Sequence, residues 1–206
     1  NPAHTLGDAN FRRHTAGQLA GVTHGNSVHR TNMVLYRAGV TTLDEYLTGS
    51  VKQKILYNGF FKKDWSIEKL AAESFTSVGA QQYANIYMRG SLFGNLLDIR
   101  LLELSEGEFG LREVLLDLIK QYGKGKPISE ETFFDDFVEM TFPEIRALFD
   151  DYVLDSKTYP LEEYFAKVGI KVTGSTQSDL VVEKLEEMTA TQKKLFDIWS
   201  KNLAIK

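Results

Sequence analysis

Apolar residues are densest between residues 83 and 122, and their spacing predicts two helices joined by a short turn. The first helix carries apolar side chains from Ile86 to Leu104 on most of its faces, which is typical of a helix buried at the centre of a domain. Gly107 and Gly110 interrupt the pattern, and a second apolar stripe begins at Leu111. We expect the two helices to lie antiparallel, with the rest of the chain packed around them.

Shorter amphipathic segments on both sides of this pair also have helical spacing. Residues that commonly cap helix N-termini precede most of them. Residues 31–39 suit the end of a helix that Gly39 closes. Further helices are expected over residues 42–57, after Ser66, after Ser129, from Pro143, over residues 161–168 and after Thr189. Residues 170–173 suit a strand, and residues 179–188 suit a strand or a helix. The pattern therefore predicts a mostly α fold, a multi-helix bundle.

Changes in composition divide the chain into three parts. Residues 1–30 hold all four histidines and four glycines with poor periodicity, which favours a loop-rich N-terminal segment. Residues 31–170 form the predicted helical domain. Residues 174–178 have the composition of a linker, so residues 171–206 are interpreted as a C-terminal appendage with a terminal helix.

The overall composition excludes several classes of protein. Hydrophobic residues make up 43% of the chain and charged residues 25%, as in ordinary globular proteins. A net charge of −4 offers no electrostatic basis for binding nucleic acid. No apolar run is long enough to predict a membrane span. The chain has no cysteine, which excludes disulfides and thiolate metal sites and fits a periplasmic, extracellular or cytoplasmic location.

A series of short motifs carries a resemblance to a known family. The motifs with the clearest match are Tyr87-Met88-Arg89-Gly90, Leu96-Leu97-Asp98-Ile99 and Glu103-Leu104-Ser105-Glu106-Gly107. In this order they resemble the glycyl aminopeptidases, zinc metallopeptidases of the thermolysin-like (gluzincin) clan. Further matches at residues 36–42, 141–144 and 159–169 extend the resemblance over about residues 30–170. The resemblance implies the C-terminal helical half of the catalytic domain of such a peptidase.

The resemblance also assigns a role to one residue of the first motif. In the family, the motif tyrosine stabilises the oxyanion of the tetrahedral intermediate, and Tyr87 stands at that position. The alternative interpretation is a tyrosine packed at the start of a buried helix. For Arg89 the alternative is a cation on the helix surface near Asp98 or Glu103.

The sequence does not contain the zinc-binding motif that the family requires. The family binds zinc through H-E-x-x-H, in which two histidines one helical turn apart face one ion, and through a third glutamate ligand. His24 and His29 are five positions apart, and neither is followed by glutamate. No Asp or Glu occurs between Asp8 and Asp44, and Ala20 stands where the third ligand is expected. We therefore predict no metal site or cofactor, although a site made only of histidines (His4, His14, His24 and His29) stays open.

Three hypotheses for function follow. In the first, the chain is a partial or degenerate relative of a zinc glycyl aminopeptidase, a pseudoenzyme without catalysis. In the second, it is a fragment of an active metallo-aminopeptidase whose zinc ligands lie outside this chain. In the third, it is a helical module that binds a peptide or a protein, which predicts exposed apolar surface.

Overall fold

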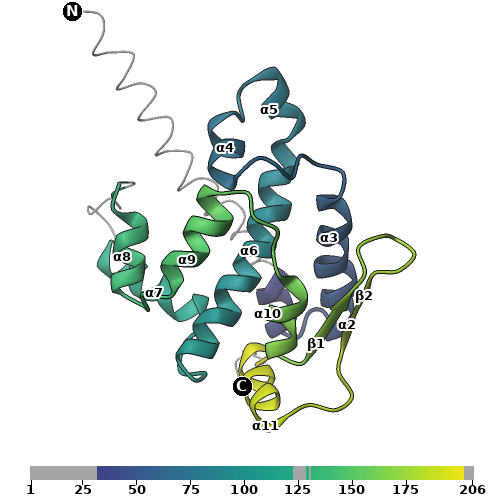
Figure 1. The fold of residues 1–206 in the computed structure, drawn as a ribbon. Coiled ribbons are helices and arrows are strands. Elements are labelled where there is room, and N and C mark those ends of the chain that lie inside the picture. Colours follow the sequence, from purple (N-terminus) through teal and green to yellow (C-terminus); the bar gives the residue numbers. More distant parts are fainter. Residues whose placement is uncertain (1–31, 123–128, 130, 202–206) are drawn as a thin grey trace, which may run out of the picture.

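The computed structural model describes residues 32–122, 129 and 131–201, and over these residues the fold is mostly helical, as predicted. The central element is α6 (Tyr83–Leu104), around which the other elements pack (Figure 1). The helices before it are α2 (Leu43–Tyr46), the π-helical η1 (Leu47–Lys52), α3 (Gln53–Asn58), α4 (Ile67–Ala72) and α5 (Ser77–Gln81). Those after it are α7 (Leu111–Gln121), α8 (Phe133–Glu139), α9 (Ile145–Phe149), the π-helical η2 (Asp150–Leu154), α10 (Leu161–Lys167) and α11 (Ala190–Trp199).

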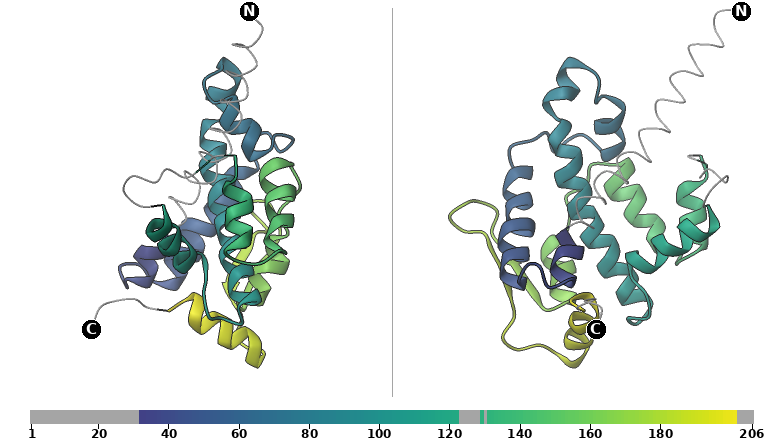
Figure 2. Two further views of the ribbon diagram at one scale, coloured as in Figure 1. Left: turned by 90° about the vertical axis from the view of Figure 1, so that its left-hand side faces the viewer. Right: turned by 180° about the vertical axis from the view of Figure 1, so that it is seen from behind.

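The arrangement places α6 in contact with helices from both halves of the chain. The views in Figures 1 and 2 agree in placing α4 and α5 at one end of α6 and α11 at the other. Helices α7, α8 and α9 lie to one side, while α3 and the strand pair lie to the other. Between Arg89 and Leu102, every residue of α6 except Arg100 is buried, including the polar Asn95 and Asp98. The expected central position of this helix is confirmed.

Several helix ends form for the reasons expected from the sequence. The Thr42 hydroxyl accepts a hydrogen bond from the Glu45 N–H, and the Glu45 carboxylate accepts one from the Thr42 N–H, which completes a capping box. Ser66 caps α4, and Thr189 with Gln192 caps α11 in the same way. Gly107 and Gly169 follow α6 and α10 with positive φ of 88° and 65°, a conformation that glycine adopts without strain.

The start of α8 differs from the expectation. The residue before its first turn is Thr132, not Ser129. The Thr132 hydroxyl donates to the Asp136 carboxylate, which also accepts a hydrogen bond from the Tyr122 hydroxyl. Phe133 and Phe137 are buried from this starting point, so burial of the aromatic face sets where the helix begins.

The two segments near the C-terminus that suited strands form one hairpin. Strands β1 (Ile170–Thr173) and β2 (Val181–Lys184) pair antiparallel, with Val172 opposite Val182. Val172, Val182 and the α11 residue Trp199 are buried in the same apolar cluster as α6. Residues 171–201 therefore pack on the helical core, while the predicted division into three parts stays a prediction. Over the residues described, no helix combines the length and the apolar content that crossing a membrane requires.

Candidate functional site

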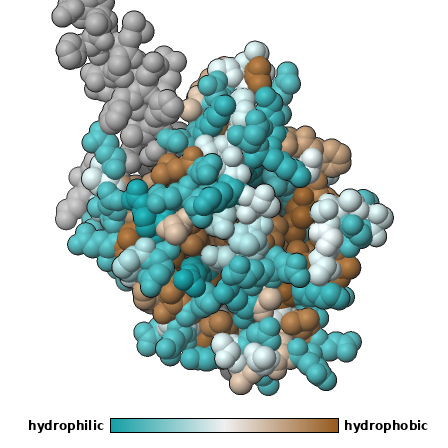
Figure 3. Space-filling model, viewed as in Figure 1, coloured by the Kyte–Doolittle hydropathy of each residue, from teal (hydrophilic) through white to brown (hydrophobic). Residues whose placement is uncertain are grey.

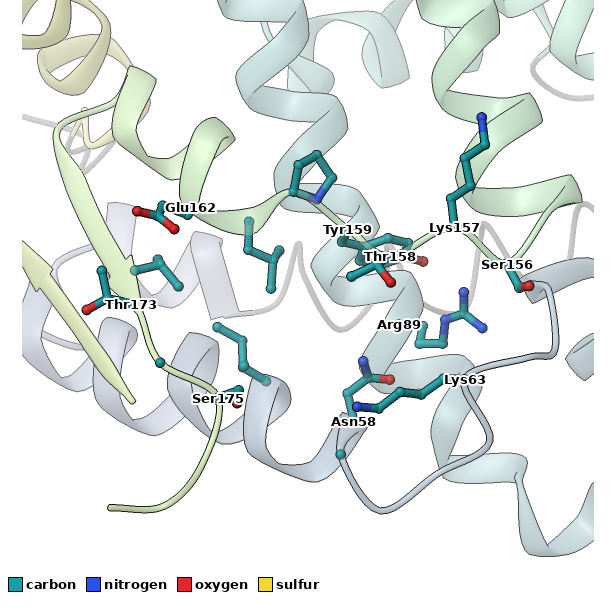
Figure 4. Close-up of a pocket in the computed structure, with 16 residues that line it drawn as sticks. Asn58, Lys63, Arg89, Ser156, Lys157, Thr158, Tyr159, Glu162, Thr173 and Ser175 are labelled. Atoms are coloured by element: carbon teal, nitrogen blue, oxygen red, sulfur yellow. The ribbon is translucent and has the colours of Figure 1, made fainter. Parts of the chain in front are cut away.

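A pocket of about 420 Å³ lies on the side of the molecule where α3, α6, α10 and β1 approach one another. Asn58 and Gly59 at the end of α3 form one wall, and residues 156–160, between η2 and α10, form another. The end of β1 closes the pocket with Thr173 (Figure 4). These segments are distant in sequence, so the pocket depends on how the helices pack. Apolar groups are present as well, contributed by Ile55, Leu161 and Val172.

Arg89 contributes a buried cation to this pocket. Its side chain is only 4% exposed, and its guanidinium donates a hydrogen bond to the Trp65 carbonyl. It also lies 5.5 Å from the centre of the Tyr159 ring. Burial raises the pKa of the Tyr159 phenol to about 12, although Arg89 acts in the opposite direction by favouring the phenolate. At neutral pH the group facing Arg89 is therefore an uncharged phenol.

The alternative that placed Arg89 on the helix surface near Asp98 or Glu103 is wrong, because its side chain is buried. Asp98 lies 3.5 Å from Arg37, and Glu103 pairs with Arg100 and Lys167. Arg89 forms no ion pair with any of the residues that the structure describes. Arg89 is buried and lines the pocket, so its side chain lies away from the surface of α6 on which Tyr83 and Tyr87 are found.

The remaining charged groups of the pocket are unevenly distributed. In Figure 4 the Lys63 side chain extends toward Asn58 on the same side of the pocket as Arg89, whereas Glu162 lies near Thr173 on the opposite side. Lys157 points out of the pocket, because its ammonium binds the Asp151 carboxylate at 2.6 Å. One end of the pocket is therefore cationic, and the other carries a carboxylate.

Tyr87, the residue singled out by resemblance, does not line this pocket. It is half-buried on α6, with its hydroxyl 3.0 Å from the Tyr83 hydroxyl and the two ring centres 5.4 Å apart. The hydrogen bond with Tyr83 is the main cause that raises the pKa of Tyr87. Since Tyr83 is itself exposed, the pair lies at the surface near the start of α6. The proposed oxyanion role is not tested by this arrangement.

The structure says nothing about a metal site made of histidines, because His4, His14, His24 and His29 lie outside the described residues. Within residues 32–122, 129 and 131–201, no group of three potential ligands is placed to hold a metal ion.

A second polar cluster, which the sequence analysis missed, is buried beside α3. Lys54 is 6% exposed, and its ammonium donates a hydrogen bond to the Ser50 hydroxyl. The same hydroxyl accepts a hydrogen bond from the Asn32 amide at 2.9 Å. Burial lowers the pKa of Lys54 from 10.5 to about 8. Lys54 follows Leu47 by seven residues and Val51 by three, so it lies on the same helical face as these apolar residues. That spacing could have predicted from the sequence that Lys54 is buried.

Exposed apolar side chains accompany these sites. Phe75 is fully exposed before α5, and Phe60, also exposed, follows α3 and contacts Tyr57 with ring centres 6.4 Å apart. Figure 3 shows apolar residues at several separate places on the face viewed, between polar ones.

No protein-family model, no curated protein and no solved structure matches this chain. Its function has to be inferred from its own residues and their geometry.

Proposed function

We propose that this chain is a non-catalytic relative of the glycyl aminopeptidases that binds a short peptide in the pocket between α3, α10 and β1. The pocket is the observation that carries the proposal. Its volume of about 420 Å³ lies within the range of roughly 300–1,000 Å³ that is usual for ligand pockets. It combines apolar walls with the Asn58 amide and the hydroxyls of Thr158 and Thr173, groups that suit the alternating apolar and polar character of a peptide.

The ordered motifs support a relation to enzymes that act on peptides, while the metal-binding residues of that family are not present in these 206 residues. There is no H-E-x-x-H sequence, and no carboxylate between Asp8 and Asp44 is available as a third ligand. The motif resemblance, taken together with the missing zinc-binding sequence, supports binding in place of hydrolysis.

Short peptides should bind this pocket weakly but specifically. At roughly 0.3 kcal/mol per non-hydrogen atom, a tripeptide should have a Kd of about 0.1–1 mM. Titration of tripeptides followed by NMR chemical shifts should move the resonances of residues 156–162 and 173–175. Thr173→Trp should weaken binding at least about tenfold, because an indole at the end of β1 occupies the cavity.

The control variant is Ser178→Trp, which adds the same side chain at an exposed position of the same hairpin, outside the pocket lining. It should leave the affinity unchanged. Absence of peptide shifts in the pocket, or equal binding by the two variants, would refute the proposed function.

A second candidate function is supported by Tyr87. Its half-buried phenol lies at the surface near the start of α6, hydrogen-bonded to the Tyr83 hydroxyl. If the complete product of the reading frame supplies zinc ligands, it should hydrolyse glycyl and alanyl anilides in a chelator-sensitive manner. Tyr87→Phe should then lower kcat by about 10²-fold, as for loss of one oxyanion donor, whereas Tyr83→Phe should have a smaller effect. Hydrolysis that is unaffected by chelator or by Tyr87→Phe would exclude this candidate.

A further inference from the structure

Arg89 places a positive charge in the pocket, and no acid among the residues that the structure describes forms an ion pair with it. A buried charge is costly unless it is paired, and the contacts of this guanidinium are with a neutral carbonyl and a neutral phenol ring. A guanidinium has five N–H donors in a planar fork that matches a carboxylate. Since Arg89 lines the pocket, a ligand entering it can supply the missing anion.

Lys63 adds a second cation at the same end. It is exposed and has no ion-pair partner within the described part of the chain. Figure 4 shows it extending over the pocket wall toward Asn58, on the side where Arg89 enters. A buried guanidinium and an exposed ammonium therefore line the same side of the cavity, where both charges attract an anionic group.

Asn58 distinguishes between possible anions. Its Oδ1 atom is buried and has no hydrogen-bond partner in the structure. An unsatisfied acceptor needs an N–H or O–H donor, which the terminal residue of a peptide provides next to its carboxylate and which a fully ionised phosphate does not. The combination of cations and a neighbouring free acceptor therefore favours a peptide carboxylate.

Glu162 sets the direction of the peptide. It lies at the opposite end of the pocket, near Thr173, and is not part of an ion pair among the residues described. A carboxylate there repels the acidic end of a ligand and attracts its amino end. The charges of the pocket thus match a short peptide with its free carboxyl end toward Arg89.

We propose that the pocket recognises the free C-terminal carboxylate of a peptide, held by Arg89 and Lys63. This inference rests on the proposed peptide binding and adds which end of the peptide is recognised. The free carboxyl terminus of the peptide, and not the peptide's side chains, should then be the main determinant of affinity.

The test compares trialanine with a free carboxylate, trialanine amide and inorganic phosphate, each titrated into the wild-type chain. The free acid should bind about 10- to 100-fold more tightly than the amide, the range expected for charge-assisted hydrogen bonds. Lys63→Met should reduce this ratio several-fold. Lys62→Met is the matched control: it removes the same charge one residue earlier, where the ammonium lies over the Trp65 ring and does not line the pocket. It should leave the ratio unchanged.

Arg89 is tested with two variants. Arg89→Lys keeps the charge but loses the planar fork, and Arg89→Met loses both, so the preference for the acid should fall in that order. If the Arg89 variants do not fold, the comparison of Lys63→Met with Lys62→Met decides the question.

The outcomes separate the two proposals. Equal binding of acid and amide, both weakened by Thr173→Trp, would overturn the carboxylate inference and leave peptide binding in place. Phosphate binding in the pocket more tightly than the peptide acid would overturn the inference in favour of a phosphate ligand. If neither peptide nor phosphate binds, both proposals are refuted.

Discussion

Replacing Asp98 by alanine should destabilise the folded chain by about 3–5 kcal/mol, the usual cost of removing one member of a buried ion pair. One carboxylate oxygen of Asp98 lies 3.5 Å from the Arg37 guanidinium, and the other accepts a hydrogen bond from the Leu111 N–H at 2.8 Å. The variant leaves the Arg37 charge buried and the first turn of α7 without that acceptor. Denaturant unfolding followed by circular dichroism measures the loss.

We expect the pair of Arg37 and Asp98 to add little net stability, although removing one partner alone strongly destabilises the fold. Burial raises the pKa of Asp98, although the Arg37 charge and the Leu111 N–H oppose that rise. The double variant Arg37→Met with Asp98→Leu should therefore be less destabilised than the sum of its single variants.

Asp117 provides the comparison for this prediction, because it forms an exposed ion pair with Lys120 on α7. Asp117→Ala should change stability by at most about 0.5 kcal/mol. A loss below about 1 kcal/mol for Asp98→Ala would show that Arg37 is satisfied without the carboxylate, against the expectation from buried pairs.

Replacing Lys54 by methionine should stabilise the chain at pH 7 by about 1–3 kcal/mol. The pKa of Lys54 is lowered from 10.5 to about 8. A shift of this size means that keeping the buried amine charged lowers the free energy of unfolding by about 3 kcal/mol. Loss of the hydrogen bond to Ser50 offsets about 1 kcal/mol of the gain. Methionine has a similar length and no charge, so it fits the same space.

The gain should depend on pH in a defined direction. Below pH 8 Lys54 is protonated in both the folded and the unfolded chain, so the folded chain is destabilised by the full free energy of burying the charged amine. Between pH 8 and 10.5 the unfolded chain binds more protons, so wild-type stability rises relative to the variant and the difference shrinks. Comparing the two chains cancels the titration of the buried tyrosines.

Lys193→Met on the exposed face of α11 is the control, with an expected change within about 0.5 kcal/mol at every pH. If Lys54→Met destabilises the chain, or if its effect is the same at pH 7 and pH 10, the desolvation account of this lysine is wrong.

The parts of the fold that depend on local sequence were predictable. Thr42, Ser66 and Thr189 marked helix starts because a capping side chain acts within three residues of itself. The apolar density of residues 86–104 predicted the central helix for the same reason, since burial leaves a pattern along the chain. The start of α8 was misplaced at Ser129 because the packing of the Phe133 and Phe137 rings, and not a capping side chain, sets where this helix begins.

The candidate site was much less predictable. The pocket joins Gly59, Arg89, Thr158 and Thr173, which come from four segments and share no spacing. The motif that named Tyr87 also contains Arg89. Their spacing of two puts the side chains on opposite faces of a helix, but it does not show which of them faces the pocket. Resemblance identified a stretch of helix, while the partner of each side chain depended on the segments packed against it.

The contact between Arg37 and α11 has a consequence for how the chain matures during translation. The Arg37 guanidinium donates two hydrogen bonds to the Trp199 carbonyl, at 2.9 and 2.7 Å, across 162 residues of sequence. Helices synthesised first can form and associate early, but their buried arginine has no such acceptor until the segment around Trp199 has left the ribosome. Nascent chains arrested before that point should therefore be more sensitive to proteases than the released protein.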